Sequence, residues 1–253
     1  MIIPTAEPFF FPGNRIGCLL VHGFTGAPKE MRWMGEYLNQ QGYSVLGVRL
    51  AGHATQPQDI LRTRWQDWLA SVEDGYDLLG GCVDQIFVIG LSLGGILTLR
   101  FASQFPVNGV VAISTPYAIP NDPRLPFIRL ISPFITWIKK GPPDWHNPEA
   151  AKDHVEYPRM PIRGILQVLD LISQMRSSLP KIQAPALIIQ SRQDGSVVPQ
   201  NAEQLLAALG SQDKNILWVE NSGHVITREP DRFLAFEAIA EFINRVTSDI
   251  QSQ

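Results

Sequence analysis

Six short apolar runs constrain the fold of this chain more than any other feature of its sequence. Each contains β-branched residues, and most are apolar continuously rather than at alternate positions. This pattern is typical of strands that are covered on both faces, as in a parallel sheet. The predicted strands are Ile16–His22, Tyr43–Val48, Gln85–Gly90, Gly109–Ile113, Pro185–Gln190 and Asn215–Glu220.

Segments with helical periodicity lie between these runs. Apolar residues recur there at three- and four-residue steps, which is typical of helices that bury one face. Strands that alternate with helices predict βαβ units, and we therefore expect an α/β fold with a mostly parallel, doubly wound sheet. The predicted helices are Lys29–Gln41, Gln58–Leu79, Gly94–Gln104, Gln200–Leu209 and Asp231–Val246.

One stretch, residues 115–180, interrupts this alternation. It separates two predicted strands and holds 11 of the 20 prolines together with several aromatic residues. A structureless loop of that length is improbable inside a compact domain. We therefore expect residues 1–114 and 181–253 to form one core, and residues 115–180 to form an inserted cap of short helices over the carboxyl edge of the sheet. The alternative is a longer crossover connection.

Charge and hydropathy exclude several classes of protein. The 253 residues carry a net charge of −3 and no basic run, so we expect no binding to nucleic acid. No apolar stretch reaches the roughly 18–20 residues that a membrane-spanning helix needs, and the first residues lack the features of a signal peptide. We expect a cytoplasmic protein without a membrane span. Cys18 and Cys82 adjoin apolar runs and are expected to be buried.

The most informative motif is Gly90-Leu91-Ser92-Leu93-Gly94, which lies between a predicted strand and a predicted helix. It matches Gly-x-Ser-x-Gly, in which a serine occupies a sharp, strained turn from strand to helix. Glycines two positions away leave the space that such a turn requires. The motif alone can arise by chance, but its position between a strand and a helix favours Ser92 as a nucleophile.

A serine nucleophile needs a histidine base that is held by an acid. In chains with this motif the acid follows the nucleophile, and the histidine follows the acid. Asp194 comes soon after the predicted strand Pro185–Gln190 and His224 after the last predicted strand, so both belong to loops at the carboxyl edge of the sheet. The competing acids are Asp122, which lies among prolines in the predicted cap, and Asp213, which precedes its strand.

Acyl transfer also needs N–H donors for the oxyanion that develops on the substrate. One is expected at the residue after the nucleophile, Leu93, and the other in the loop after an early strand. That loop is HGFTG, residues 22–26, and the N–H of Phe24 is the candidate donor. The alternative is a glycine-rich turn with no donor role.

No cofactor or metal is expected. The chain has no glycine-rich phosphate-binding motif, and its cysteines lack the spacing of metal ligands. His22 and His53 are more simply explained as residues that tie loop backbone together by hydrogen bonds. His146 and His154 lie in the predicted cap, without a carboxylate or cysteine partner at ligand spacing.

In several segments the chain resembles α/β-hydrolases of the bacterial carboxylesterase and monoacylglycerol lipase group. The serine motif alone is common to many hydrolases, whereas the HGFTG loop combined with RLAGH and GLSLGG is found in a considerably smaller group of them. The resemblance implies an α/β-hydrolase fold with a small helical cap, no cofactor and a cytoplasmic location. The segments that carry it are 18–32, 42–59, 68–79, 86–95, 185–199 and 221–229.

The resemblance also implies roles for individual residues. It implies Ser92, Asp194 and His224 as a catalytic triad, in agreement with the interpretation of the motifs. Phe24 and Leu93 are implied as the backbone oxyanion donors. The group commonly has Gly-His-Gly where this chain has glycine, histidine and alanine at 52–54, which puts the loop shape near the pocket in question.

We therefore expect a serine ester hydrolase that cleaves short- to medium-chain carboxylic esters through an acyl-enzyme. The expected partner is a small-molecule ester. The nearest alternatives are a monoacylglycerol lipase or a thioesterase with the same triad, followed by a carbon–carbon bond hydrolase that acts on a diketone. An alternative of another class is a ligand-binding protein that keeps this fold without catalytic activity.

Overall fold

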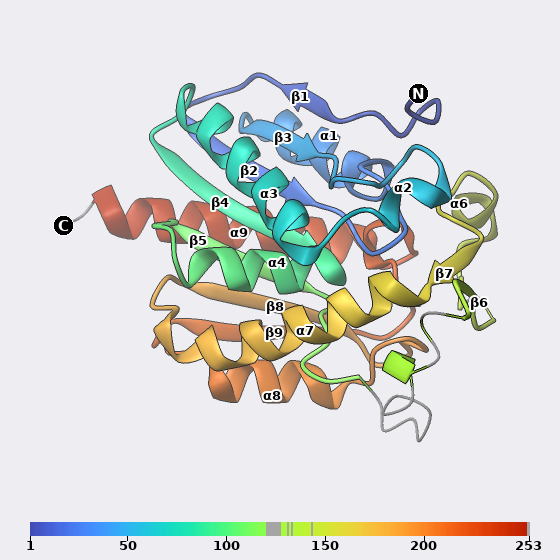
Figure 1. The fold of residues 1–253 in the computed structure, drawn as a ribbon. Coiled ribbons are helices and arrows are strands. Elements are labelled where there is room, and N and C mark those ends of the chain that lie inside the picture. The colour runs from blue at the N-terminus through green and yellow to red at the C-terminus, as the bar shows by residue number, and fades with distance from the viewer. Residues whose placement is uncertain (120–127, 131, 133, 143, 252–253) are drawn as a thin grey trace.

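The computed structural model describes residues 1–119, 128–130, 132, 134–142 and 144–251 (Figure 1). Its centre is a seven-stranded sheet in the order β1-β3-β2-β4-β5-β8-β9. Neighbouring strands are parallel except for β1, which pairs antiparallel with β3 at one edge. The strands are β1 (Phe9–Phe11), β2 (Ile16–Val21), β3 (Ser44–Val48), β4 (Gln85–Leu91), β5 (Gly109–Ile113), β8 (Ala186–Ser191) and β9 (Lys214–Val219).

The sheet contains all six predicted strands, and their predicted ends lie within one residue of the observed ends. Strand β1 was not predicted. It is only three residues long, is flanked by Pro8 and Pro12, and pairs with one neighbour at the edge, where proline is tolerated.

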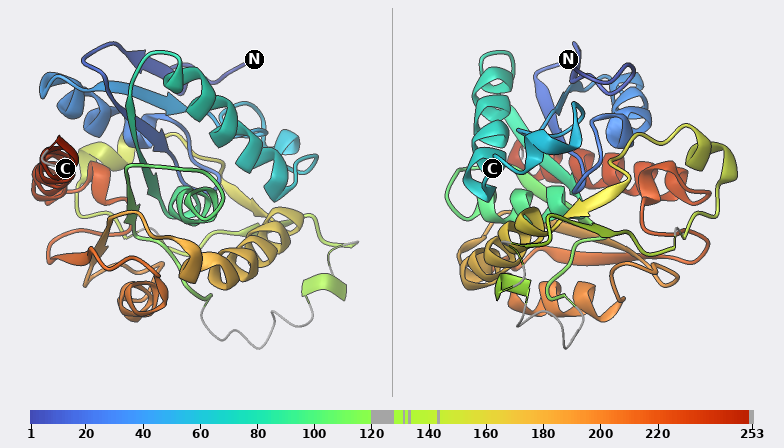
Figure 2. Two further views of the ribbon diagram at one scale, coloured as in Figure 1. Left: turned by 90° about the vertical axis from the view of Figure 1, so that its left-hand side faces the viewer. Right: turned by 45° about the vertical axis from the view of Figure 1, so that its right-hand side comes forward.

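Helices cover both faces of the sheet, as the two views of Figure 2 show. Helices α1 and α9 pack on one face, where Met34 and Phe236 are buried. The other face is covered by α3, α4, α7 and α8, where Trp68, Leu97 and Leu171 are buried. The expected doubly wound α/β architecture is confirmed. The helices are α1 (Lys29–Gln40), α3 (Trp65–Gly80), α4 (Leu93–Ala102), α7 (Ile162–Ser178), α8 (Gln200–Ala208) and α9 (Arg232–Gln251), with short turns η1 (Leu179–Lys181) and η2 (Ile226–Arg228).

The single helix predicted over Gln58–Leu79 is two helices, α2 (Pro57–Ile60) and α3. The break has a local cause, because Arg64 is extended and its N–H donates to Asp67 Oδ2 at 2.7 Å. A carboxylate that caps the N-terminus in this way starts a new helix. The apolar periodicity continues through the break and therefore did not reveal it.

The stretch 115–180 differs from the expected set of short helices. It contains β6 (Trp137–Lys139), α6 (Pro148–Lys152) and β7 (Arg159–Pro161), and β6 and β7 form a small antiparallel sheet. It also contains the 17-residue helix α7, which packs against α3 and α4. Figure 1 shows β6, α6 and β7 beyond the ends toward which the parallel strands point. The division of the chain into core and cap stays a prediction.

Two expectations about composition have different outcomes. Cys18 is buried in β2, but Cys82 is exposed in the turn between α3 and β4, so the prediction was wrong for Cys82. Among the helices of the described residues, none has the length and apolar character that a membrane crossing requires.

Candidate active site

Ser92 directly follows β4, the middle strand of the sheet, and is the N-cap of α4. Its φ of 55° and ψ of −115° form a conformation that residues with a side chain rarely adopt. Its N–H donates to the carbonyl of Ile113 on the neighbouring strand at 2.8 Å, which holds the turn against the sheet. The strained strand-to-helix turn that the motif predicted is therefore present.

Two glycines make this turn sterically possible. A Cβ at Gly90 would lie 2.1 Å from the carbonyl oxygen of Gly94. A Cβ at Gly94 would lie 2.1 Å from the carbonyl oxygen of Val21 in β2. Both distances are far below van der Waals contact, so any side chain at these positions would push α4 away from the sheet.

His224, in the loop after β9, connects Ser92 with Asp194, in the loop after β8. Its Nε2 lies 2.9 Å from Ser92 Oγ, and its Nδ1 lies 3.1 and 3.0 Å from the two carboxylate oxygens of Asp194. Asp194 Oδ1 also accepts the N–H groups of Ser196 and Val197, both at 2.8 Å. The structure thus brings together the three side chains that the sequence selected from distant loops.

Asp194 and His224 each shift the pKa of the other toward the charged form. Burial alone would raise the pKa of Asp194, but the charge and hydrogen bond of His224 and two backbone N–H groups hold it below its ordinary value. Burial alone would lower the pKa of His224, but Asp194 and the more distant carboxylates of Asp144 and Glu30 raise it above its ordinary value. A carboxylate that stays ionised beside the histidine favours the protonated imidazole.

The HGFTG loop, residues 22–26, follows β2 and lies beside Ser92. A Cβ at Gly23 would be 3.6 Å from Ser92 Cβ, so the backbone of the loop passes close to the serine. Among the described residues, neither the N–H of Phe24 nor that of Leu93 has a hydrogen-bond partner. Both N–H groups are therefore free to donate to a bound group.

His22 and His53 hold loop backbone in place, as expected. His22 Nδ1 donates to the carbonyl of Gly23 at 2.9 Å, and its Nε2 accepts the N–H of Leu50 at 3.1 Å. His53 Nδ1 lies 3.0 Å from the carbonyl of Ala51. Burial lowers the pKa of His53 to about 4 and that of His22 well below its ordinary value. Both imidazoles are therefore neutral near pH 7.

Ala54 adopts a left-handed conformation, with φ of 56°. Glycine takes this conformation at little cost, which gives a physical reason for the glycine that the resembling group commonly has there. In this chain the Ala54 methyl group packs with Ala6 and Ala27 in a small buried cluster, and its carbonyl accepts the N–H of Ile3 at 2.8 Å. The loop is thus held in the left-handed conformation by its own contacts.

The remaining candidates from the sequence lie elsewhere. Asp122 is outside the described residues, and Asp213 precedes β9 and pairs with Arg245. His154, which has no carboxylate or cysteine partner at ligand spacing in the sequence, lies 3.4 Å from Glu30, a carboxylate far away in sequence. Over the described part of the chain, no cluster of three or more His, Cys, Asp or Glu residues is arranged to hold a metal ion.

Asp144 is a residue of the site that the sequence did not indicate. It lies between β6 and α6, and its Oδ2 accepts the N–H of Gly195 at 2.9 Å and the N–H of His224 at 3.0 Å. One carboxylate therefore joins the loop of Asp194 to the loop of His224. Its partners are backbone groups, which leave no residue pattern in the sequence.

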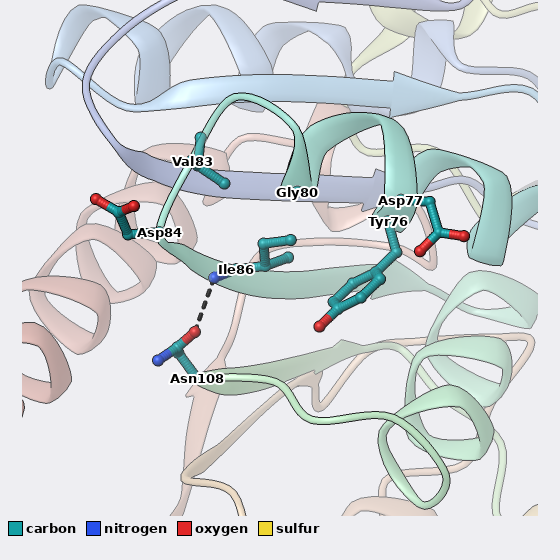
Figure 3. Close-up of a pocket in the computed structure, with 7 residues that line it drawn as sticks. All are labelled: Tyr76, Asp77, Gly80, Val83, Asp84, Ile86 and Asn108. Atoms are coloured by element: carbon teal, nitrogen blue, oxygen red, sulfur yellow. Dashed lines mark hydrogen bonds between the residues drawn. The ribbon is translucent and has the colours of Figure 1, made fainter.

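A surface pocket of about 320 Å³ lies away from this site (Figure 3). It is lined by the end of α3 and the start of β4, where the N–H of Ile86 donates to Asn108 Oδ1 at 2.8 Å. Ser92 follows the opposite end of β4. The pocket therefore belongs to the amino-terminal edge of the sheet and takes no part in the arrangement around Ser92.

Comparison with known proteins identifies the family. The family model described as serine aminopeptidase, S33 (Hydrolase_4), matches residues 14–231. The chain belongs to this family. A thermostable monoacylglycerol lipase of Bacillus sp. (strain H-257) is 36% identical over 249 residues, which cover 95% of each chain. A carboxylesterase of Bacillus subtilis (strain 168) is 30% identical over 248 residues, which cover 97% of this chain and 99% of the relative.

Solved structures of proteins similar to this S33 family member have the same fold. A structure reported for LipS and LipT, two metagenome-derived lipolytic enzymes, is 34% identical with a TM-score of 0.90, covering 97% of this chain and all of that one. The monoacylglycerol lipase of Paleococcus ferrophilus has a TM-score of 0.81 at 22% identity, covering 95% and 98%, a likeness that shows the fold alone. The expected α/β-hydrolase fold and the expected class, a carboxylic ester hydrolase, are confirmed. The cytoplasmic location stays a prediction.

Proposed function

We propose that this protein hydrolyses neutral carboxylic esters of short to medium acyl chain through an acyl-enzyme at Ser92. The observation that carries the proposal is the hydrogen-bonded row Ser92–His224–Asp194, with contacts of 2.9 to 3.1 Å between side chains from three different loops. A binding protein has no need of all three groups in this order. The two Bacillus relatives support ester hydrolysis as the reaction.

In the proposed mechanism, His224 takes the hydroxyl proton as Ser92 Oγ attacks the ester carbonyl carbon. The carbonyl π electrons move to the oxygen, and the resulting oxyanion accepts the N–H groups of Phe24 and Leu93. The tetrahedral intermediate collapses, and the alcohol leaves with the proton that His224 delivers. Water then attacks the acyl-enzyme, with His224 again as the base, and releases the acid and free Ser92.

Asp194 has a different task in this proposal. Its carboxylate holds His224 in the tautomer with Nδ1–H and stabilises the imidazolium that forms. The hydrogen bonds that Asp194 accepts from Ser196 and Val197 keep it ionised and fix its orientation. The acid therefore never needs to accept the proton itself.

A substrate panel tests the proposed reaction. The wild-type enzyme is expected to cleave p-nitrophenyl esters, to react covalently with a fluorophosphonate at Ser92, and to leave a diketone intact. Monoacylglycerols and acyl thioesters belong in the same panel, since a lipase or thioesterase would use the same residues. If p-nitrophenyl esters are not cleaved while the fluorophosphonate still labels Ser92, turnover of a monoacylglycerol or of an acyl thioester would identify which of those alternatives holds.

Trp137 is expected to influence which acyl chains are accepted. It pairs with Pro161 in the small sheet, and Pro161 and the ring of Phe24 both lie against Gly164 of α7. Trp137 is therefore near the side chain of a proposed oxyanion donor. One methylene in an apolar pocket is worth roughly 1–3 kcal/mol, so Trp137→Ala should change the ratio of rates on short and long esters by about tenfold. The measurement is kcat/KM on p-nitrophenyl esters of graded length.

Phe134 offers a control for this substitution. Its side chain is also aromatic and belongs to the same stretch, but it is 87% exposed. Phe134→Ala is therefore expected to leave the ratio near the wild-type value. An unchanged ratio in Trp137→Ala, or equal changes in both variants, would show that Trp137 does not contact the acyl chain.

The pH dependence should report on His224 and on Asp144. Only neutral His224 accepts a proton, so kcat/KM is expected to rise with pH, with a midpoint above 6.5 because its pKa is raised. Asp144→Asn keeps an oxygen that accepts the two loop N–H groups but removes a charge that raises this pKa. The midpoint should therefore move to lower pH in this variant.

Asp231→Asn is the matched control for this shift. Asp231 Oδ2 also accepts N–H groups of the histidine loop, those of Glu220 and Asn221, at 3.1 and 2.6 Å. The carboxylates that raise the pKa of His224 are instead Asp194, Asp144 and Glu30. A midpoint that stays in place in Asp144→Asn, or moves equally in both variants, would contradict the assignment of the rise in kcat/KM to the deprotonation of His224.

A further inference from the structure

The HGFTG loop encloses a buried carboxylate that the proposed mechanism does not use. Glu30, in the first turn of α1, is 4% exposed, and its Oε2 accepts the N–H of Gly23 at 2.8 Å. A Cβ at Gly26 would lie 2.1 Å from Glu30 Oε1, so the carboxylate occupies space that only a glycine leaves. Glu30 therefore fixes the loop backbone on both sides of Phe24.

The partner of this carboxylate comes from the stretch 115–180. His154 Nε2 lies 3.4 Å from Glu30 Oε1, and both side chains are only 6% exposed. The His154 ring lies edge-on against Trp145, with ring centroids 4.9 Å apart. A buried carboxylate costs free energy unless it is paired and hydrogen-bonded, and His154 is placed to supply the pairing charge.

Lys140, which belongs to a second charged pair, also ties the same loop to the same stretch. Lys140 Nζ donates to Thr25 Oγ1 at 2.7 Å and pairs with Glu156. The N–H of Tyr157 donates to the carbonyl of Thr25 at 2.9 Å. Thr25 has φ of 62°, which is uncommon for a β-branched residue and needs such contacts to hold it. The loop is thus held by Glu30 of α1 and by Lys140 and Tyr157 of the stretch 115–180.

The charges explain why the pairing matters for catalysis. Burial raises the pKa of Glu30, and so does Glu156, while His154, the N–H of Gly23 and Lys140 act in the opposite direction. Burial also acts to raise the pKa of Glu156, but hydrogen bonds from His154 and Lys140 lower it to about 2. An unpaired Glu30 would add a negative charge close to the developing oxyanion.

We propose that Glu30 is a positioning residue for the oxyanion donor Phe24, and that His154 completes it through a buried ion pair. The inference rests on the proposed function, since it concerns the oxyanion donors of that reaction. It assigns to the stretch 115–180 a part in the rate of the chemical step, beyond its expected part in substrate choice.

Three variants test the role, and a fourth serves as their control. Glu30→Ala is expected to lower kcat about tenfold to a hundredfold, less than the roughly hundredfold to thousandfold cost of losing an oxyanion donor outright, with KM nearly unchanged. Glu30→Gln keeps an oxygen for the N–H of Gly23 and should recover most of that loss. His154→Ala should lower kcat severalfold. The rate of fluorophosphonate labelling at Ser92 should fall in each variant in proportion to its loss of kcat, and most in Glu30→Ala.

Asp153→Ala is the matched control. Asp153 precedes His154 and makes ion pairs with Lys29, the neighbour of Glu30, and with Arg228, at 2.5 and 2.8 Å. It therefore joins the same two segments without touching the HGFTG loop. Asp153→Ala is expected to lower Tm while leaving kcat at the wild-type value.

These measurements distinguish a failure of the positioning role from a failure of the proposed ester hydrolysis. A wild-type enzyme without ester turnover contradicts the function, and the labelling rates of Ser92 then still decide whether Glu30 and His154 act. Wild-type kcat and labelling rate in Glu30→Ala would overturn the positioning role. So would losses of kcat that follow the losses of Tm in all variants, Asp153→Ala included. If Glu30→Ala fails to fold, a wild-type kcat in His154→Ala overturns the ion pair.

Discussion

Ser92→Ala is expected to lower kcat by about 10⁴- to 10⁶-fold, the largest effect of any single substitution in this chain. The alanine has no nucleophile to form the acyl-enzyme, and the residual rate comes from substrate binding and the oxyanion donors. The fold should survive, because alanine is smaller and meets the same backbone strain at φ of 55° as serine does. Ester turnover and a melting curve, recorded on one preparation, check both parts.

Ser114→Ala is the control that the structure offers for this result. Ser114 also follows a strand, β5, is fully buried, and has a positive φ of 46°. Its hydroxyl has no hydrogen-bond partner among the described residues, so removing it should leave kcat unchanged. Near-wild-type turnover by a clean preparation of Ser92→Ala would reject Ser92 as the nucleophile.

Asp194→Asn is expected to lower kcat by about 10⁴-fold. Because Oδ1 of this residue accepts the N–H groups of Ser196 and Val197, the asparagine would keep its oxygen there and turn its NH₂ group toward His224. An NH₂ group donates to Nδ1, which stabilises the wrong tautomer of the imidazole and cannot stabilise the imidazolium. Side-chain volume and backbone contacts barely change, so Tm should fall much less than activity.

Asp122→Asn supplies the comparison, because Asp122 is the competing acid in the sequence. Its substitution should leave most of the ester turnover intact. If Asp122→Asn loses more activity than Asp194→Asn does, the acid of the site has been assigned to the wrong loop. A pH profile of both variants strengthens the test, since the acid that contacts His224 should also change the midpoint.

The parts of the structure that the sequence predicted well are those in which neighbours along the chain determine the conformation. Buried parallel strands are continuous apolar runs, and the turn at Ser92 needs glycines at fixed distances along the chain. The side chains of Asp194 and His224 could be selected because their loops follow strands of one parallel sheet, whose carboxyl ends meet at one edge.

The residues that the sequence did not reveal act through contacts between distant segments. Asp144 binds two backbone N–H groups, and Glu30 contacts His154, which lies 124 positions later in the chain, without any sequence pattern that marks the pair. The break between α2 and α3 depends on the capping carboxylate of Asp67, while the apolar periodicity continues across it. The strand β1 escapes detection because it pairs along one edge over only three residues.

The carboxylate of Asp144 has a consequence for protein engineering. Exchanging the stretch 115–180 between related hydrolases is an obvious way to transfer substrate preference, on the view that it forms a module separate from the chemistry. In this chain the exchange would also remove the anchor that joins the loops of Asp194 and His224. A chimera should therefore carry an acidic residue at position 144, or be selected first for recovered turnover and only then for a new substrate.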